Sequence, residues 1–183
     1  GGGAWGTALA ATARRAGREV ALWAHEEEVV DSVNRRHENP LFLPGVRLDP
    51  AIRATGDLAE ACDGILLVVP AQHLRSVAMR LAPHVPKRRP LLLCAKGIEQ
   101  KTLALMTEVA AEVIPQARLA VLSGPTFAIE VARGLPTAVT LASGELAVAR
   151  NFIAALGTKT FRPYLSDHPV GAEIRGAAKN VLP

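Results

Sequence analysis

Three glycines at the start of the chain have a spacing that could hold phosphate groups. Gly1, Gly3 and Gly6 form the pattern Gly-x-Gly-x-x-Gly. In dinucleotide-binding loops with this pattern, the glycines allow a tight turn, a close approach of the backbone to a pyrophosphate, and close packing of the following helix. That helix also presents unpaired N–H groups and a positive dipole end to the phosphates. Glycine-rich turns are common, but the helix stop at Gly17 and the strand expected after it favour a dinucleotide site.

The end of that next strand carries the residues that bear on the choice between NAD and NADP. An acidic side chain at this place commonly binds the ribose hydroxyls of NAD. Here the strand ends in Trp23 and Ala24 and is followed by His25 and Glu26. His25 could accommodate a 2′-phosphate, whereas Glu26 would oppose one. The acidic run 26–28 also suits the first turn of a helix, and we favour that interpretation. The preference between the two cofactors therefore stays open.

Two further candidate groups follow expected strands. Lys96 comes directly after the apolar run 91–95. Ligands of open parallel sheets bind beyond the carboxyl ends of the strands, so we expect Lys96 to point into such a cleft. The segment 123–128, Ser-Gly-Pro-Thr-Phe-Ala, lies between a strand and a helix, where its N–H groups could hold an anion. A routine turn capped by Thr126 fits that segment equally well.

Lys179 and Asn180 lie on the last expected helix, directly after the small residues 176–178. Small neighbours permit close packing, and a second cation nearby would lower the pKa of Lys179 toward the range useful for proton transfer. The local sequence by itself favours a solvent-exposed lysine.

The elements that must position these residues alternate along the chain. Short apolar runs alternate with segments of helical periodicity, which predicts βαβ units and an α/β fold with a Rossmann-like, doubly wound, mainly parallel sheet. The continuous apolar run 64–69 suits a central strand, and Pro70 ends it. We expect helices at 7–16, 26–36, 58–61, 72–81, 103–114, 127–133, 146–156 and from 170, strands at 19–24, 52–55, 64–69, 90–95, 118–122, 137–142 and 161–165, and a loop at 38–45.

Composition excludes several classes of protein. The 183 residues are 49% hydrophobic, which is enough for a large core and excludes a disordered chain. Aromatic residues make up only 4% and the net charge is +4, so we expect no nucleic acid as partner. Cys62 and Cys94 have neither metal-ligand spacing nor a disulfide pattern, so we expect reduced thiols, no metal and a cytoplasmic location. No apolar run is long enough for a membrane span.

Five sequence blocks together carry a resemblance to a known family. They are GGGAWGTALA (1–10), NPLFLPG (39–45), CAKGIE (94–99), LSGPTFAIEVA (122–132) and AAKNV (177–181). In this order they closely resemble the bacterial NAD(P)-dependent sn-glycerol-3-phosphate dehydrogenases, over the whole chain. The resemblance implies interconversion of dihydroxyacetone phosphate and sn-glycerol 3-phosphate by hydride transfer with NADH or NADPH, for glycerophospholipid synthesis.

The resemblance also implies roles for particular residues. Lys179 would donate or accept the proton, and Lys96 would act beside both cofactor and substrate, so these two are the expected catalytic residues. The expected substrate contacts are Lys96, Gly124, Thr126, Lys179 and Asn180, and the expected cofactor contacts are Gly1, Gly3, Ala4, Trp5, Gly6, His25, Lys96 and Ala128.

The two ends of the sequence suggest a piece of a longer protein. A glycine loop should follow a strand, yet the sequence begins on Gly1, and the last helix is still periodic at Pro183. We expect 1–166 to be a dinucleotide-binding domain without its first strand, and 167–183 to begin a helical substrate domain. The chain alone is then expected to be inactive, and a homodimer is a further expectation.

Two alternatives stay open. The first is another dehydrogenase of similar architecture, acting on 3-hydroxyacyl-CoA, ketopantoate or 6-phosphogluconate. Such enzymes share the glycine loop, but we do not expect them to share the blocks around Lys96 and at 123–132. The second is a non-catalytic dinucleotide-binding module. A module of this kind needs the cofactor pocket but no proton donor, so the pair Lys96 and Lys179 argues against it.

Overall fold

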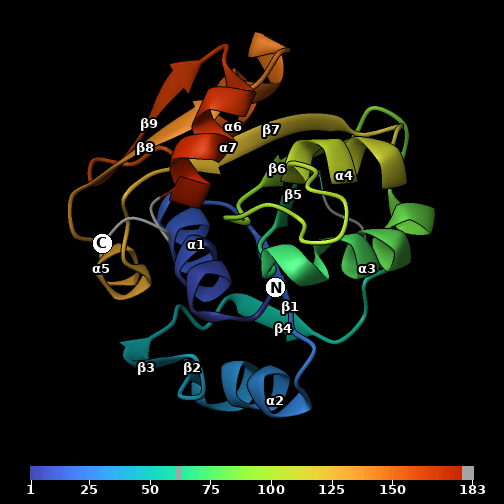
Figure 1. The fold of residues 1–183 in the computed structure, drawn as a ribbon. Helices are drawn as coiled ribbons and strands as arrows, with labels where there is room; N and C mark the ends of the chain where they lie inside the picture. Colours follow the sequence, from blue (N-terminus) through green and yellow to red (C-terminus); the bar gives the residue numbers. More distant parts are fainter. Residues whose placement is uncertain (61–62, 179–183) are drawn as a thin grey trace.

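The computed structural model describes residues 1–60 and 63–178 (Figure 1). Helices and strands alternate over much of the described chain, as the sequence predicts, but four strands in succession lie between the second and third helices. The helices are α1 (Ala4–Arg15), α2 (Glu27–Arg36), α3 (Ala71–Leu81), the short 3-10 helix η1 (Ala82–His84), α4 (Met106–Val113), α5 (Ala128–Ala132), α6 (Leu146–Leu156) and α7 (Pro169–Ala178), and the strands are β1 (Val20–Trp23), β2 (Glu38–Asn39), β3 (Leu43–Arg47), β4 (Ile52–Thr55), β5 (Ile65–Leu67), β6 (Pro90–Leu93), β7 (Arg118–Ser123), β8 (Thr137–Ala142) and β9 (Phe161–Ser166).

The main sheet has five strands in the order β5-β6-β7-β8-β9, and β1 pairs with β4 in a separate two-stranded sheet. The pairs β1–β4, β5–β6, β6–β7 and β8–β9 are parallel, whereas β7–β8 is antiparallel. The arrangement confirms the predicted α/β class with a mainly parallel sheet. The reversal at β8 follows the five-residue helix α5, and apolar periodicity does not encode strand direction.

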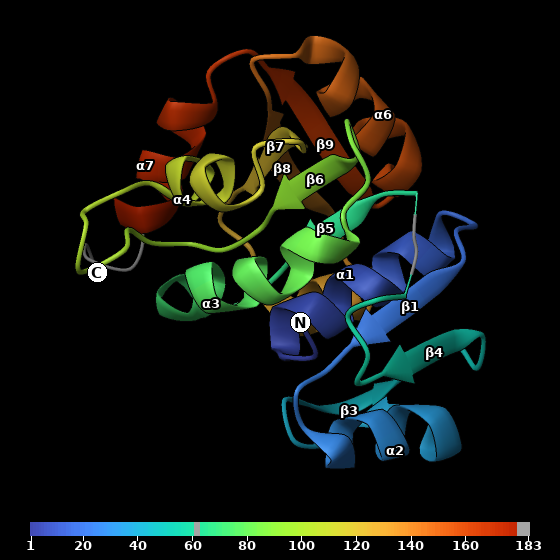
Figure 2. The same ribbon diagram turned by 90° about the vertical axis from the view of Figure 1, so that its right-hand side faces the viewer.

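Helices cover both faces of the main sheet, which explains its continuous apolar strands. Leu91 and Leu93 pack in the core with residues of α3 and α4, whereas Leu92 packs in the core with residues of α1 and α6. Figure 2 shows helices on both sides of the strands. All three leucines are at most 1% exposed. Burying a leucine fully contributes about 1.5–3 kcal/mol, so β6 stabilises both layers of the fold.

Two local predictions are wrong. Residues 38–45 were expected as a loop, but β2 and β3 pair there as a short antiparallel hairpin. Residues 58–61 were expected as a helix capped by Asp57, but the structure has a turn at 58–59 and no helix at residue 60, and residue 61 lies outside the described residues. The carboxylate of Asp57 accepts the N–H of Ala59 at 2.8 Å. This contact closes a local turn in place of a helical cap.

Cys94 is buried, and burial raises the pKa of its thiol to about 12, so the thiol stays protonated. Cys62 lies outside the described residues. In the described part of the chain, no helix combines the length and apolar character of a membrane span, and no cluster of three side chains could hold a metal ion.

Candidate active site

The glycine loop lies between the ends of β1 and β5. A Cβ atom on Gly1 would overlap the carbonyl oxygen of Val68, which follows β5. A Cβ on Gly2 would lie 2.6 Å from the Cβ of Ala24, which follows β1. A Cβ on Gly6 would overlap the carbonyl oxygen of Gly1, so helix α1 packs against the loop only if residue 6 is glycine. The loop is therefore held tightly against the strand ends and the helix.

The N-terminus of α1 is open toward a ligand. Gly3 is its N-cap, no side chain caps the first turn, and that turn contains no acidic residue. Among the described residues, no atom beyond its chain neighbours would lie within 4 Å of a Cβ on Gly3. Ala4 and Trp5 begin the helix at this point. An uncapped helix N-terminus beside free space suits an anionic group, so these residues fit the pyrophosphate of a dinucleotide.

Lys96 lies where three elements meet. It follows β6 and is half-buried, and its Nζ donates to the carbonyl oxygen of Gly124, after β7, at 3.0 Å. The same Nζ lies 5.6 Å from the centre of the Trp5 ring, within range of a cation–π interaction. The structure thus brings Trp5, Lys96 and Gly124 together at the carboxyl ends of parallel strands, beside the glycine loop.

The loop after Lys96 is held by the start of α3. Gly97 has φ +139°, and a Cβ there would lie 2.9 Å from the Cβ of Ala71, so only glycine fits. The side chain of Gln72 donates to the carbonyl oxygen of Ile98 at 2.9 Å and accepts the N–H of Gln100 at 3.0 Å. These contacts fix the path of the backbone that leaves Lys96.

A second anchor of this loop is an ion pair. Arg75 of α3 binds both carboxylate oxygens of Glu99, at 2.9 and 3.0 Å, and also binds Glu112. The hydrogen bonds from Arg75 and then from Thr102 lower the pKa of Glu99 to about 2. The carboxylate of Glu99 therefore stays ionised at neutral pH, and the bidentate pair holds the loop in one geometry.

Helix α7 packs against the same centre. A Cβ on Gly176 would lie 2.8 Å from the Oγ of Ser123 and 3.9 Å from the Cγ of Lys96. Glycine at this position therefore lets α7 approach the end of β7. Lys179 and Asn180, the sequence-predicted proton donor and substrate contact, lie outside the described residues.

Glu173 fixes α7 against α4. Its side chain is 6% exposed and accepts the backbone N–H of Thr107, at 2.9 Å, and the hydroxyl of the same residue. Burial raises the pKa of Glu173, and this effect exceeds the opposing effect of the hydrogen bonds from Thr107. Glu173 thus accepts a backbone N–H in the first turn of α4, where N–H groups have no partner within the helix.

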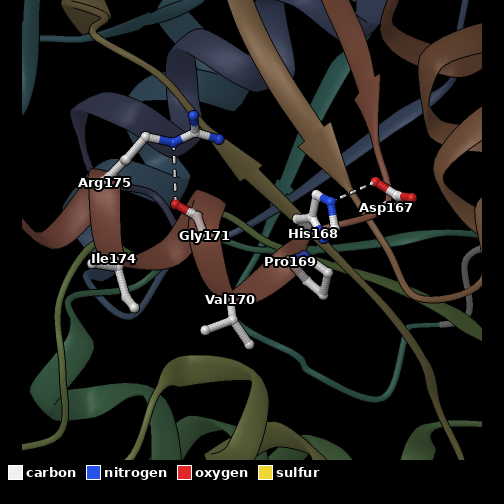
Figure 3. A pocket seen from close by; sticks show the side chains of 7 residues that line it. All are labelled: Asp167, His168, Pro169, Val170, Gly171, Ile174 and Arg175. Atoms are coloured by element: carbon white, nitrogen blue, oxygen red, sulfur yellow. Dashed lines mark hydrogen bonds and ion pairs between the residues drawn. The ribbon is translucent and has the colours of Figure 1, made fainter.

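Two hollows adjoin α7. The smaller, of about 240 Å³, is next to the centre because Ser123, Gly124 and Gly176 line it together with Pro125, Thr140, Ala172 and Arg175. The larger, of about 720 Å³, lies along residues 167–171, 174 and 175 (Figure 3). Figure 3 shows Val170 and Ile174 on one side of α7, and both are half exposed. Only the smaller hollow shares residues with the centre around Lys96.

The remaining predicted contacts are His25, Thr126 and Ala128. His25 is exposed in the bend after β1, next to Ala24 and so beside the glycine loop. Thr126 is half-buried, two residues after Gly124. Ala128 begins α5, which is held against α1 because Arg15 donates to the carbonyl oxygens of Val131 and Ala132. The structure places His25 and Ala128 on elements that contact the loop or α1.

Sequence reasoning missed the side chains that position the site. Gln72, Arg75 and Glu173 act through contacts with residues 24 to 66 positions away along the chain. The one local signal is an acidic residue, Glu173, three positions before Gly176 in a helix that is otherwise rich in small and apolar residues.

The fold and the site define an α/β domain of the dinucleotide-binding type, with a lysine at the carboxyl ends of its parallel strands. A family model described as "NAD-dependent glycerol-3-phosphate dehydrogenase N-terminus" matches residues 1–149. The chain therefore belongs to this family, as its sequence predicts.

Individual relatives agree. The glycerol-3-phosphate dehydrogenase [NAD(P)+] of Paramagnetospirillum magneticum is 64% identical over the whole chain, which covers 67% of that protein. The protein of the same name from Parvibaculum lavamentivorans is 61% identical, and the chain covers 55% of it. The crystal structure of glycerol-3-phosphate dehydrogenase from Coxiella burnetii matches 98% of this chain with a TM-score of 0.92 at 36% identity, and 56% of that chain is covered. The chain thus spans between about half and two thirds of these relatives.

Proposed function

We propose that the protein containing this chain interconverts dihydroxyacetone phosphate and sn-glycerol 3-phosphate by NAD(P)-dependent hydride transfer. The observation that carries the proposal is the position of Lys96. Its Nζ binds Gly124 and lies over Trp5, beside an open helix N-terminus and a hollow of about 240 Å³. Relatives that are 61–64% identical over the whole chain bear the name of this enzyme.

The cofactor would be held by the glycine loop. The backbone at Gly1, Gly3 and Gly6 and the first turn of α1, with Ala4 and Trp5, would bind the pyrophosphate. The nicotinamide cofactor supplies the hydride when bound. His25 is exposed beside the loop and would contact the adenosine ribose, so the choice between NAD and NADP would depend on this region.

The substrate would be activated by the lysine centre. The ammonium group of Lys96 stabilises negative charge on the substrate oxygens, and Gly124, Thr126 and Asn180 contact the substrate. Lys179 transfers the proton to or from the substrate oxygen. In the sequence, Lys179 comes three positions after Gly176, and a Cβ on Gly176 would lie 3.9 Å from the Cγ of Lys96. An ammonium group held near a second one would have a lowered pKa, which would suit proton transfer.

A substrate panel tests this proposal. The full-length protein is assayed for oxidation of NADH and NADPH with dihydroxyacetone phosphate, acetoacetyl-CoA and ketopantoate, and for oxidation of 6-phosphogluconate with NAD and NADP. We expect turnover with dihydroxyacetone phosphate alone. Preference for another substrate would assign the protein to a related dehydrogenase. Cofactor binding without turnover would make it a non-catalytic dinucleotide-binding module.

We also propose that two parts of the chain have different roles. Residues 1–166 bind the dinucleotide, and 167–183 begin the helical part that completes the substrate site. The location would be the cytoplasm and the assembly a homodimer. Cell fractionation and sedimentation of the full-length protein test these two points, and a membrane-bound or monomeric protein would contradict them.

A further inference from the structure

Asn39 is a buried side chain that reaches the glycine loop from the β2–β3 hairpin. It is 1% exposed. Its Nδ2 donates to the carbonyl oxygen of Gly2 and to the hydroxyl of Thr7, both at 2.8 Å. Its Oδ1 accepts the N–H of Phe42 at 3.2 Å. The orientation of the amide is set by these partners, because Phe42 offers only a donor and Gly2 only an acceptor.

Asn39, Gly2 and Thr7 form a closed hydrogen-bond network beneath the glycine loop. The hydroxyl of Thr7, which is fully buried, donates to the carbonyl oxygen of Gly2 at 3.2 Å while it accepts from Asn39. Gly2 is the residue between the first two glycines of the phosphate-binding pattern, and Thr7 lies in α1. One side chain therefore ties the loop to the helix that it precedes.

We propose that Asn39 is a positioning residue, which holds the glycine loop in the conformation that receives the pyrophosphate before the cofactor binds. The inference rests on the proposed function, because it requires the loop to bind a dinucleotide. Asn39 is buried and its Nδ2 is bound to Gly2 and Thr7, so it would act on the cofactor through these two residues.

The amide is chemically required at this position. In Asn39→Asp a carboxylate oxygen would replace Nδ2 and face the carbonyl oxygen of Gly2, an acceptor against an acceptor. The added negative charge would also lie under a loop built to receive phosphates. In Asn39→Ser the shorter side chain would lose its reach to Gly2 without adding charge. Both changes free the loop to adopt other conformations, which must then be ordered when the cofactor binds.

A matched control is available in Asn34. Its Nδ2 donates to the carbonyl oxygen of Ala54 at 3.0 Å and its Oδ1 accepts the N–H of Ala54 at 2.8 Å. This is the same pairing of an asparagine amide with backbone groups, but it joins α2 to β4. Asn34 is exposed, whereas Asn39 is buried. Substitution of Asn34 removes an amide pairing with backbone groups without touching Gly2 or Thr7, and the urea midpoints compare the loss of stability in the two pairs of variants.

The experiment compares Asn39→Asp, Asn39→Ser, Asn34→Asp and Asn34→Ser in the full-length protein. The dissociation constants of NADH, NADPH and ADP-ribose are measured together with kcat, the KM for the cofactor and the midpoint of urea unfolding. ADP-ribose contains the pyrophosphate but lacks the nicotinamide. We expect both Asn39 variants to weaken the preferred cofactor and ADP-ribose by the same factor, roughly tenfold or more, with kcat at saturating cofactor within about twofold of the wild type.

Two outcomes contradict the inference. Folded Asn39 variants that bind ADP-ribose as tightly as the wild type would overturn it. Equal losses of affinity in the Asn34 variants would show that Asn39 only supports the fold and does not position the loop. If Asn39→Asp does not fold, Asn39→Ser, which adds no charge, decides the question by the same measurements. A wild-type protein that binds none of the three ligands would instead overturn the proposed function itself.

Discussion

At the scale of single residues, Gly3 and Gly6 serve different purposes in one loop. A Cβ on Gly6 would overlap the carbonyl oxygen of Gly1, whereas a Cβ on Gly3 would have no described atom within 4 Å apart from those of its chain neighbours. Gly3 also has an extended backbone that any residue can adopt. Gly6 is therefore required by the packing of α1, and Gly3 by the space that a ligand would occupy.

This difference predicts that the same substitution lowers stability at Gly6 but lowers cofactor affinity at Gly3. Gly6→Ala should destabilise the protein by about 1–3 kcal/mol, because the new methyl group forces the loop and helix apart. Gly3→Ala should leave the free energy of unfolding nearly unchanged but weaken cofactor binding at least tenfold. Urea unfolding and cofactor titration of both variants check the prediction. A Gly3→Ala variant with wild-type affinity would show that no phosphate lies against Gly3.

Lys179 carries a prediction that comes from the resemblance alone. Lys179→Ala in the full-length protein should lower turnover by orders of magnitude, because the substrate oxygen loses its proton partner. The dissociation constant of the cofactor should change little, because the glycine loop is untouched. Steady-state kinetics and cofactor titration separate the two effects, and near-normal turnover would remove Lys179 from the proposed mechanism.

At the scale of elements, two buried carboxylates anchor the site with opposite dependence on pH. Hydrogen bonds from Arg75 lower the pKa of Glu99 from 4.5 to about 2. The stability that Glu99 contributes is thus fully present above pH 4.5 and is lost as pH falls toward 2. Burial raises the pKa of Glu173 above 4.5, so its ionisation lowers stability as pH rises from 4.5 through the raised value.

The glutamine variants should reveal these opposite signs. As pH falls below 4.5, the wild type should lose stability relative to Glu99→Gln. As pH rises above 4.5, the wild type should lose stability relative to Glu173→Gln, in which the amide can still meet both groups of Thr107. Urea unfolding from pH 2.5 to pH 8 measures both differences. A pH-independent difference for either variant would contradict the assigned shift.

Apolar patterning predicted most elements but not how they are joined. Strand β4 has the predicted bounds 52–55, because alternation and flanking turns are local signals. The hairpin at 38–47 was missed, since its two prolines and Gly45 indicate a loop, while the side chain of Asn39 anchors it to a distant segment. The site was predicted in part: the sequence placed Lys96 and Gly124 after strands, but the contacts from Gln72 and Glu173 depend on the folded chain.

At the scale of the whole molecule, helix α7 has an exposed apolar side. Val170 and Ile174 are each 51% exposed along a hollow of about 720 Å³. The chain spans only part of its relatives' length, so the substrate site is expected to need residues beyond those given. The isolated chain should therefore show no turnover with dihydroxyacetone phosphate under conditions in which the full-length protein is active. Substantial turnover by residues 1–183 alone would show that the lysine centre is sufficient.

The central claim is that the ammonium group of Lys96 acts on a triose phosphate beside a bound nicotinamide. The most direct test is cofactor oxidation with dihydroxyacetone phosphate by full-length wild type, Lys96→Met and Lys101→Met. Lys101 is an exposed lysine in the same loop, so it controls for the loss of one positive charge. We predict a fall in kcat of roughly 10²–10³ for Lys96→Met and wild-type kinetics for Lys101→Met. Equal activity of all three proteins would contradict the claim.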